Sequence, residues 1–475
     1  MDVGTSSVRA SIVREDASIA LEHRRAVLPS TPNPGFVEFD AAVMASAVLD
    51  VSRAALADVG SVDVVAIANQ RCSTIVWDRT TGEPVGPGVS WQDLRTAGMC
   101  VTLQARGVRV APSSSATKLA FLLDMVDPDR TRDLCFGTVD TWVAWVLSGG
   151  GLHVTDASNA AVTGLMELDG SGWAPTTLEV LGIPPSVLPT IVDSSGVVGE
   201  AAALTGSPPI AGIAGDQQAS LVGQGATLPG LAKLTFGTGG MLNLCLGDGR
   251  PTFERKGESG TFPIVAWRRH GRITWGLEAF MLHAGQAVEW LRDDLRIIAT
   301  SAESEAVAAE CRTTDDVWFV PSLLGMGTPV WDFGARGTLL GLTRGSGRPQ
   351  VVRAVLEGVA HRGTDLVEAI EADAGVSLET LRVDGGMSAN WVFVQALADA
   401  AQRPVELSPV PEATTLGAAF LAGLALGTWA DEAELAATWS PRAIVTPKRR
   451  PDRARWRDAC ERARRWMPEL SALDF

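Results

Sequence analysis

Several residue types are scarce in this chain, and each scarcity argues against a class of protein. Tyrosine is absent and lysine occurs only four times, so arginine carries nearly all of the positive charge. The formal net charge of −15 at pH 7 argues against a nucleic-acid or membrane-surface partner, because binding to phosphates needs a basic surface. One stretch, residues 448–465, is basic, and we interpret it as the solvated face of a C-terminal helix.

Cysteine pairs and long apolar runs are missing as well. The six cysteines are scattered without a CxxC pair, which indicates reduced thiols in a cytoplasmic protein rather than a disulfide framework or a zinc site. The longest apolar run, residues 416–426, is too short to cross a bilayer. We therefore expect a buried helix there and no membrane partner.

Two common nucleotide-binding signatures are also missing. The chain has no Gly-Lys dipeptide, which a Walker A loop requires. It has no GxGxxG motif after a strand, since Gly325 and Gly327 lack a third glycine at the required spacing. These absences argue against a P-loop protein and against a dinucleotide-binding domain.

Two Gly-Thr turns, one in each half of the chain, are the main positive signal. Residues 2–13 (DVGTSSVRASIV) and 234–245 (LTFGTGGMLNLC) each predict a β-hairpin with a tight glycine turn and a hydroxyl at its tip. Such turns expose backbone N–H groups that suit an anion. One such turn alone is usually a plain hairpin. Two of them predict a nucleoside triphosphate held between two similar domains.

The length and the order of elements predict an α/β protein of two domains. A chain of 475 residues is long enough for two or more cores. Each half opens with a hairpin and then alternates strands with helices, so we expect an N-terminal domain at 1–228 and a C-terminal domain at 229–475. Helices are predicted at 41–58, 118–126, 278–292, 350–374, 391–401 and 415–426. Strands are predicted at 62–68, 134–140, 210–214 and 381–384.

Polar residues follow several of these strands, where open α/β sheets bind ligands. Asp216 follows the strand at 210–214, and a carboxylate there can accept a proton from a substrate hydroxyl while Gln217 fixes a second one. The alternative is a helix N-cap. Asp2 can hold Mg²⁺, often through water. The turn at 385–390 (GGMSAN) can approach a phosphate or nucleoside, or can be a plain capped connection.

Taken together, these stretches resemble the FGGY carbohydrate kinases, and among them the glycerol kinases most. The matching segments occur in family order from Asp2 to about Trp466, and they are specific as a set rather than singly. They are DVGTSSVRASIV, NPGFVEFD, AIANQRCSTIVWD, FGTVDTWVAW, HVTDASNA, IAGDQQASLVGQ, TFGTGG, VPSLLGMGTPVWD, ARGTLLGLTRG, LRVDGGMSAN and TTLGAAFLAGLALG.

The resemblance implies two ribonuclease-H-like (actin-like ATPase) domains flanking a central cleft, with ATP mainly on the second and the hydroxylated substrate on the first. It implies ATP and Mg²⁺ as cofactors, a homodimer or larger homo-oligomer, and a role in carbohydrate or glycerol metabolism. It makes Asp216 the catalytic base and gives Asp2 to magnesium. The positions that it gives to ATP are Thr5, Ser6, Arg9, Thr238, Gly285, Glu289, Gly386 and Asn390.

The acceptor pocket is where this chain departs from the glycerol kinases. The positions that it shares with them are Arg71, Trp91, Asp216 and Gln217. Cys72 stands where the family has Glu, Ser113 where it has Tyr, and Leu282 roughly where it has Phe. Losing a carboxylate that accepts hydroxyl hydrogen bonds should cost about 1.5–3 kcal/mol of glycerol binding. A further departure is Glu289, where the family has Gln.

These features predict ATP-dependent phosphorylation of a primary hydroxyl on a small polyol or sugar, with a four- or five-carbon acceptor filling the pocket better than glycerol. Two alternatives remain open at this point. One is an actin-like ATPase or nucleotide-sensing module, which would not need Arg71, Trp91 and Gln217 beside Asp216. The other is a protein that binds a polyol without phosphorylating it.

Overall fold

The computed structural model describes residues 1–473 of the chain. The N-terminal half supplies six strands to the main sheet and seven helices. The strands are β1 (Asp2–Val3), β2 (Ser7–Val13), β3 (Ile19–Ala26), β5 (Val65–Asn69), β11 (Ser195–Glu200) and β12 (Pro209–Gly215). The helices are α1 (Ala41–Val59), α2 (Ala97–Gln104), α3 (Ser115–Val126), α4 (Val139–Leu147), α5 (Ala157–Val162), α6 (Pro175–Leu181) and α7 (Asp216–Gly223).

The C-terminal half supplies seven strands to the same sheet and eight helices within residues 1–473. The strands are β13 (Ala232–Phe236), β14 (Gly240–Gly247), β15 (Phe262–Arg269), β16 (Arg272–Met281), β19 (Leu381–Asp384), β20 (Val405–Leu407) and β21 (Ala443–Val445). The helices are α8 (Gly285–Asp293), α9 (Glu303–Ala309), α10 (Arg348–Ala374), α11 (Trp391–Ala401), α12 (Ala413–Leu426), α13 (Glu432–Ala437), α14 (Arg453–Ala463) and α15 (Pro468–Ser471).

Four small two-stranded sheets and two short 3₁₀ helices, Pro185–Val187 and Gly386–Ala389, complete the secondary structure of the described chain. The sheets pair β4 (Glu38–Phe39) with β7 (Gly88–Val89), β6 (Ile75–Asp78) with β8 (Leu134–Gly137), β9 (Val154–Asp156) with β10 (Thr190–Val192), and β17 (Trp318–Val320) with β18 (Thr338–Leu340). These ribbons lie outside the main sheet. The predicted α/β class is confirmed.

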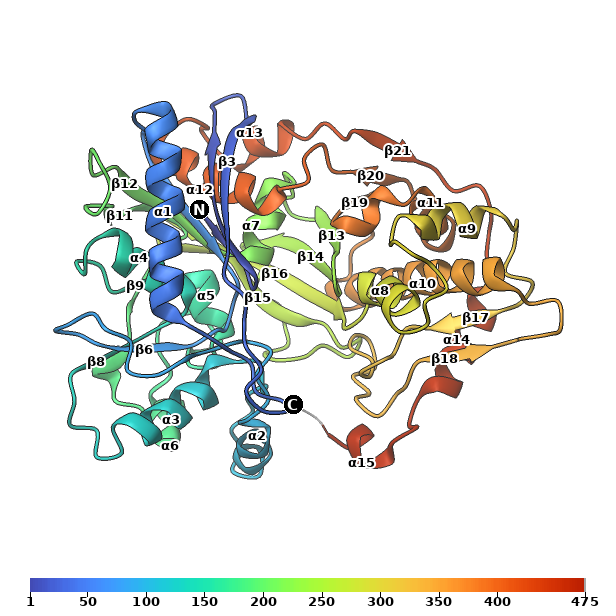
Figure 1. Cartoon of the computed structure of the whole chain (residues 1–475), viewed down its shortest axis with the longest axis horizontal. Helices are drawn as coiled ribbons and strands as arrows, with labels where there is room; N and C mark the ends of the chain where they lie inside the picture. Colours follow the sequence, from blue (N-terminus) through green and yellow to red (C-terminus); the bar gives the residue numbers. More distant parts are fainter. Residues whose placement is uncertain (474–475) are drawn as a thin grey trace.

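One 13-stranded sheet runs through both halves of the molecule (Figure 1). Its strand order is β21-β20-β19-β13-β14-β16-β15-β11-β12-β5-β1-β2-β3. The two halves meet at β11 and β15, where a single pair of residues, Ser195 and Arg269, is in register. The predicted domain boundary falls in the connection between α7 and β13, and the division at residue 228 stays a prediction.

Helix α1 shows how the local sequence builds the N-terminal half. Asp40 caps it by accepting hydrogen bonds from the backbone N–H groups of Ala42 and Val43. Apolar residues recur at helical spacing along the helix, and that face is buried against β2 and β3. Strand β12 is an apolar run buried on both faces, as expected for a central strand parallel to β5.

Helices α7 and α12 cross at the junction of the two halves (Figure 1). A Cβ atom on Gly417 would overlap the carbonyl oxygen of Ala219, and one on Gly223 would overlap that of Ala413. The two helices therefore meet backbone to backbone, which only glycine allows. Since α7 begins at Asp216, this contact fixes the start of α7 against the C-terminal half.

Most of the predicted elements are present, with two clear exceptions. The prediction of a helix beginning at Glu278 is wrong, because that residue pairs within β16 and the helix begins only at Gly285. The strand predicted at 134–140 ends at Gly137, and Asp140 lies in α4. Strand pairing with β14 and β15 overrides the helical spacing around Glu278.

The predictions about membrane-spanning segments and about cysteine pairing can be compared with the structure. The predicted apolar helix at 416–426 is the greater part of α12, and most of its residues are buried. None of the helices within residues 1–473 combines the length and apolarity needed to span a bilayer. All six cysteines are free thiols.

Candidate active site

The centre of the site is Arg71, which lies in the loop after β5. Its guanidinium donates two hydrogen bonds to Glu278 on β16, at 2.9 and 3.0 Å. Its Nε atom lies 3.5 Å from Oδ1 of Asp216, the first residue of α7. The Arg71 and Glu278 side chains are almost fully buried, whereas 34% of the Asp216 side chain is exposed. Arg71 thus joins a buried carboxylate to one that faces solvent.

The charges of this group fit a proton acceptor at Asp216. Burial raises the pKa of Asp216, and Arg71 and the backbone N–H of Gln217 oppose that rise. Burial acts to lower the pKa of Arg71, but Glu278 and Asp216 more than offset it and the net direction is upward. The arginine therefore stays charged. A partly exposed carboxylate with a raised pKa is suited to general-base chemistry.

Two further predicted acceptor residues, Gln217 and Trp91, are fixed by hydrogen bonds. Gln217 follows Asp216 directly, and its Oε1 atom accepts a hydrogen bond from Lys233 at 2.6 Å. Trp91 is 37% exposed and donates its indole N–H to Thr5 Oγ1 at 3.1 Å. Met241 on β14, which no motif singled out, has its sulfur 3.9 Å from Arg71. That Leu282 lines the pocket stays a prediction.

The two substituted positions supply neither a carboxylate nor an aromatic ring. Cys72 has a positive φ of 63°, and its thiol donates to the carbonyl oxygen of Val162 at 3.2 Å. Burial raises the pKa of this thiol, so it is neutral near pH 7. Ser113 is exposed, and its carbonyl oxygen accepts a hydrogen bond from the buried ammonium of Lys118 at 2.7 Å.

The predicted nucleotide residues of the C-terminal half surround the turn between β13 and β14. The carbonyl of Thr238 accepts the backbone N–H of Ala284 at 2.8 Å, and the carbonyl of Gly237 accepts that of Gly285 at 2.8 Å. A Cβ atom on Gly285 would lie 2.7 Å from the Gly237 oxygen, so the start of α8 requires glycine there. Glu289 is exposed one turn further along α8.

The second glycine turn of this half follows β19. Gly385 has a φ of 86°, and a Cβ atom on it would lie 2.5 Å from the carbonyl oxygen of Phe236. Nothing lies within 4 Å of a Cβ atom on Gly386, so that position is open. Asn390 caps α11 through Phe393 N–H at 3.0 Å and donates to Ser304 at 3.1 Å. The capping alternative for Asn390 is therefore realised, and its nucleotide contact stays a prediction.

The predicted nucleotide and magnesium residues of the N-terminal half lie on the hairpin of β1 and β2. Arg9 forms an ion pair with Glu412, the residue before α12, and lies 3.8 Å from Asp2. Burial raises the pKa of Asp2 to about 6; Arg9 lowers it, and Asp216 and Glu412 raise it further. Ser6 is exposed. Asp2 and Asp216 are thus close enough to interact electrostatically.

The Asp2 and Asp216 carboxylates fit a magnesium ion. Burial raises the pKa of both carboxyl groups even though each has an arginine beside it, so a further cation would stabilise their charged forms. Mg²⁺ is commonly bound through one or two carboxylates together with substrate phosphates. Among residues 1–473 no group of three or more His, Cys, Asp or Glu side chains forms a metal cage. The available donors therefore suit an ion shared with a nucleotide.

Several site residues were not predicted. Glu278 was hidden inside an apparent helix, and its partner Arg71 is 207 residues away in sequence. Lys233 and Asp384 lie on the two strands that lead into the glycine turns, and the scarcity of lysine was the one available signal for the first. Glu412 lies in a loop without a recognised motif.

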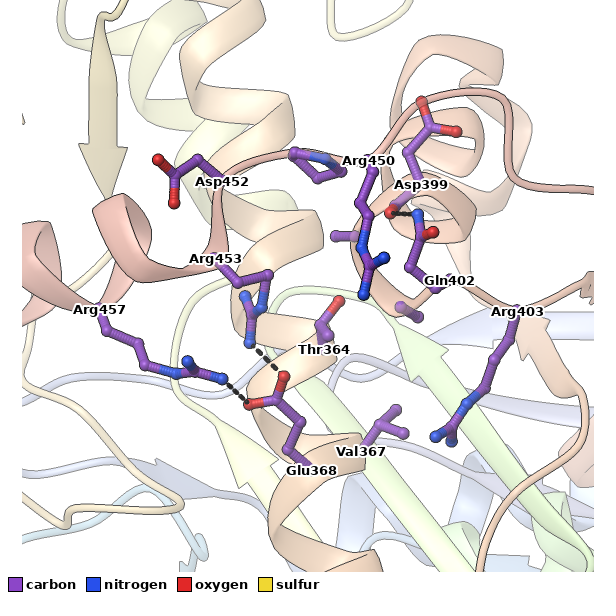
Figure 2. Close-up of a pocket in the computed structure, with 13 residues that line it drawn as sticks. Thr364, Val367, Glu368, Asp399, Gln402, Arg403, Arg450, Asp452, Arg453 and Arg457 are labelled. Atoms are coloured by element: carbon purple, nitrogen blue, oxygen red, sulfur yellow. Dashed lines mark hydrogen bonds and ion pairs between the residues drawn. The ribbon is translucent and has the colours of Figure 1, made fainter.

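A separate hollow lies on the C-terminal half, between α10, the end of α11 and the start of α14 (Figure 2). Arg453 and Arg457 both pair with Glu368 there, and Arg403 pairs with Glu371 outside the hollow. The side chain of Arg450 points into the hollow. Much of the basic stretch at 448–465 is thus matched by carboxylates, which gives no indication of a polyanion surface.

Comparisons with known proteins were made on the sequence and on the fold. Residues 1–223 match the N-terminal domain of the FGGY family of carbohydrate kinases, and residues 232–426 match its C-terminal domain. The chain is 42% identical to the glycerol kinase of Aromatoleum aromaticum, with 98% of each chain covered. It is 39% identical to glycerol kinase 2 of Thermotoga maritima, again with 98% of each covered.

Solved structures give the same picture. The fold matches a Plasmodium falciparum glycerol kinase solved with ADP, with a TM-score of 0.88 and 26% identity over 100% of this chain and 98% of that one. It matches a xylulose kinase from Brucella ovis with a TM-score of 0.85 and 25% identity over 100% and 99%. The predicted two-domain, actin-like fold is confirmed.

Proposed function

Because this chain belongs to the FGGY family of carbohydrate kinases and is an ATP-dependent kinase of a polyol or sugar, we propose that Asp216 is its catalytic base and that a primary hydroxyl is its acceptor. The observation that carries the proposal is the position of Asp216. It starts α7, faces solvent in part, is held by Arg71, and lies within electrostatic range of Asp2.

On the acceptor side, Arg71, Trp91 and Gln217 position the polyol. Asp216 accepts the proton of the hydroxyl as its oxygen attacks the γ-phosphoryl group. Arg71 keeps Asp216 in place and is itself held by Glu278, so the base needs no rearrangement before it acts. Contact between the two halves would exclude water and limit wasteful hydrolysis of ATP.

On the nucleotide side, the amides of the turn at 237–239 and the Thr238 hydroxyl stabilise charge on the transferred group. Thr5, Ser6 and Arg9 contribute from the opposite turn, and Arg9 exchanges its pairing with Glu412 for the phosphates. The remaining nucleotide contacts that we propose are Gly285, Glu289, Gly386 and Asn390. Asp2 and Asp216 would hold Mg²⁺, which neutralises phosphate charge when bound.

We further propose that the preferred acceptor has four or five carbons. Cys72 directs its thiol to Val162 and Ser113 is an exposed small residue, so the pocket lacks the carboxylate and the ring that would close around glycerol. Glu278 does not replace that carboxylate, because its oxygens are already engaged by Arg71 and Asn243. Glycerol remains a second candidate, since the relatives named above are glycerol kinases.

An ADP-release assay over glycerol, the tetritols, the pentitols and common ketoses tests both parts of this proposal. We expect acceptor-dependent ADP release, with kcat/KM for the best larger acceptor at least about tenfold above that for glycerol, the equivalent of one lost charged hydrogen bond. Glycerol as the best acceptor would contradict the pocket argument. ADP release that no acceptor stimulates would contradict the kinase mechanism.

A further inference from the structure

Lys233 is a fully buried lysine at the meeting point of the two sides of the site. It lies on β13, and its ammonium donates to Gln217 Oε1 at 2.6 Å and to Thr235 Oγ1 at 2.9 Å. Burial lowers its pKa to about 8, against the opposing effects of Asp384, Glu278 and Asp216. The side chain is therefore mostly protonated at neutral pH.

The bond to Lys233 determines which way the amide of Gln217 points. A protonated lysine can only donate hydrogen bonds, so the Gln217 atom that faces it must be the oxygen. The amide NH₂ group is then left to donate a hydrogen bond to the acceptor. The backbone N–H of Gln217 already bonds to Asp216 at 2.8 Å, so the side-chain NH₂ group is the donor that this residue has left for the acceptor. Asp216 remains the neighbouring group that accepts.

Lys233 also contacts the strands that lead to both glycine turns. Strand β13 continues from Lys233 through Thr235 to the turn that carries Thr238. Thr235 is in register with Asp384 of β19, and Asp384 precedes the Gly385 turn. One ammonium thus lies where the acceptor residue and the two nucleotide strands converge. A purely structural need at such a place would be met at lower cost by an apolar side chain, since burying a charge is unfavourable.

We propose that Lys233 is a positioning residue for the acceptor: it holds the Gln217 amide with its NH₂ group toward the polyol hydroxyl and ties that amide to the strand of the phosphate-binding turn. This inference rests on the proposed function of the same site. It predicts that Lys233 acts through Gln217, so its loss should affect acceptor binding more than ATP binding.

The test compares Lys233→Met with wild type, using ATP and whichever of glycerol, erythritol and xylitol gives the highest wild-type turnover. We expect the acceptor KM to rise about tenfold, as for loss of one hydrogen bond to a charged group, and the ATP KM to change less than about twofold. Lys233→Arg, which keeps the donors, should regain part of the acceptor affinity. Lys448→Met, an exposed lysine on the same half, is the matched control and should change neither constant.

Two Gln217 variants separate this role from support of the fold. In a Gln217→Ala background, Lys233→Met should raise the acceptor KM no further, because the amide it orients is gone. Gln217→Glu keeps an oxygen for Lys233 but has no donor for the acceptor, so it should fold normally and raise the acceptor KM by a similar factor. This variant and Lys233→Arg decide the question if Lys233→Met does not fold.

Equal rises in both Michaelis constants, or a full additive effect of Lys233→Met in the Gln217→Ala background, would overturn the inference. So would a normal acceptor KM in Gln217→Glu. Failure of the proposed function itself looks different: wild type would then release no ADP in response to glycerol or to any of the tetritols, pentitols and common ketoses.

Discussion

The proposed acceptor region and the proposed nucleotide region of this molecule are built in different ways. The acceptor region is a network of side chains, in which Arg71 joins Asp216 to Glu278 and Lys233 holds Gln217. The nucleotide region is shaped by backbone. Only glycine fits at positions 285 and 385, because a Cβ atom there would approach a carbonyl oxygen too closely. Hydrogen bonding and charge therefore limit which residues the first region accepts, and steric contact with the main chain limits which residues the second accepts.

This difference would account for the departures from the glycerol kinases that the sequence predicts at Cys72 and Ser113, and the predicted departure at Glu289 is at an exposed side chain rather than a turn glycine. A side-chain pocket can change its ligand by exchanging single residues, as at Cys72 and Ser113, while the sheet behind it is unchanged. A backbone-lined turn has no such freedom, because any larger residue displaces the main chain. We therefore expect substitutions in the two regions to change different kinetic constants, and three experiments test this.

The largest effect should follow from Asp216→Asn. The amide keeps the size of the side chain but cannot accept the hydroxyl proton, so we expect kcat to fall by about 10²–10⁴-fold, the usual contribution of a general base. ADP binding, measured by calorimetry, should stay within a few-fold of wild type. Turnover near the wild-type level would remove Asp216 from the chemistry and would place catalysis on the nucleotide side alone.

A smaller effect is expected from Gly385→Ala. The positive φ of 86° and the approach to Phe236 both oppose a methyl group, so the turn should shift and the ATP KM should rise about tenfold, with the acceptor KM nearly unchanged. Gly375→Ala, just after α10, is the matched control, because Gly375 also has a positive φ and a Cβ atom on it would meet no neighbour within 4 Å. If the two variants behave alike, close approach does not shape this region.

A change no larger than that of Gly385→Ala is expected from the double substitution Cys72→Glu and Ser113→Tyr. Restoring the carboxylate and the ring should raise kcat/KM for glycerol by about tenfold relative to wild type, by analogy with one charged hydrogen bond. The ATP KM is the internal control and should not change. No gain on glycerol, in a variant whose melting temperature is near that of wild type, would refute the account of the acceptor pocket.

Features that depend on neighbouring residues along the chain could be predicted from the sequence alone. Asp216 after an apolar run, the Gly237–Thr238 turn and the Gly385–Gly386 turn were all recognisable, because turn glycines and strand ends are set by short-range sterics. The apolar run at 416–426 was also recognisable as a buried helix. The α/β class followed from the order of these elements, and the family resemblance followed from the set of sequence motifs shared with the FGGY kinases.

The contacts between those elements could be seen only in the folded structure. Strand pairing placed Glu278 in β16 and brought it to Arg71, and the crossing of α7 and α12 at two glycines fixed the start of α7. The bond from Lys233 to Gln217 likewise joins a strand of one half to a helix of the other. Such contacts depend on groups far apart in sequence, and no local pattern records them, because they arise from packing of the whole chain.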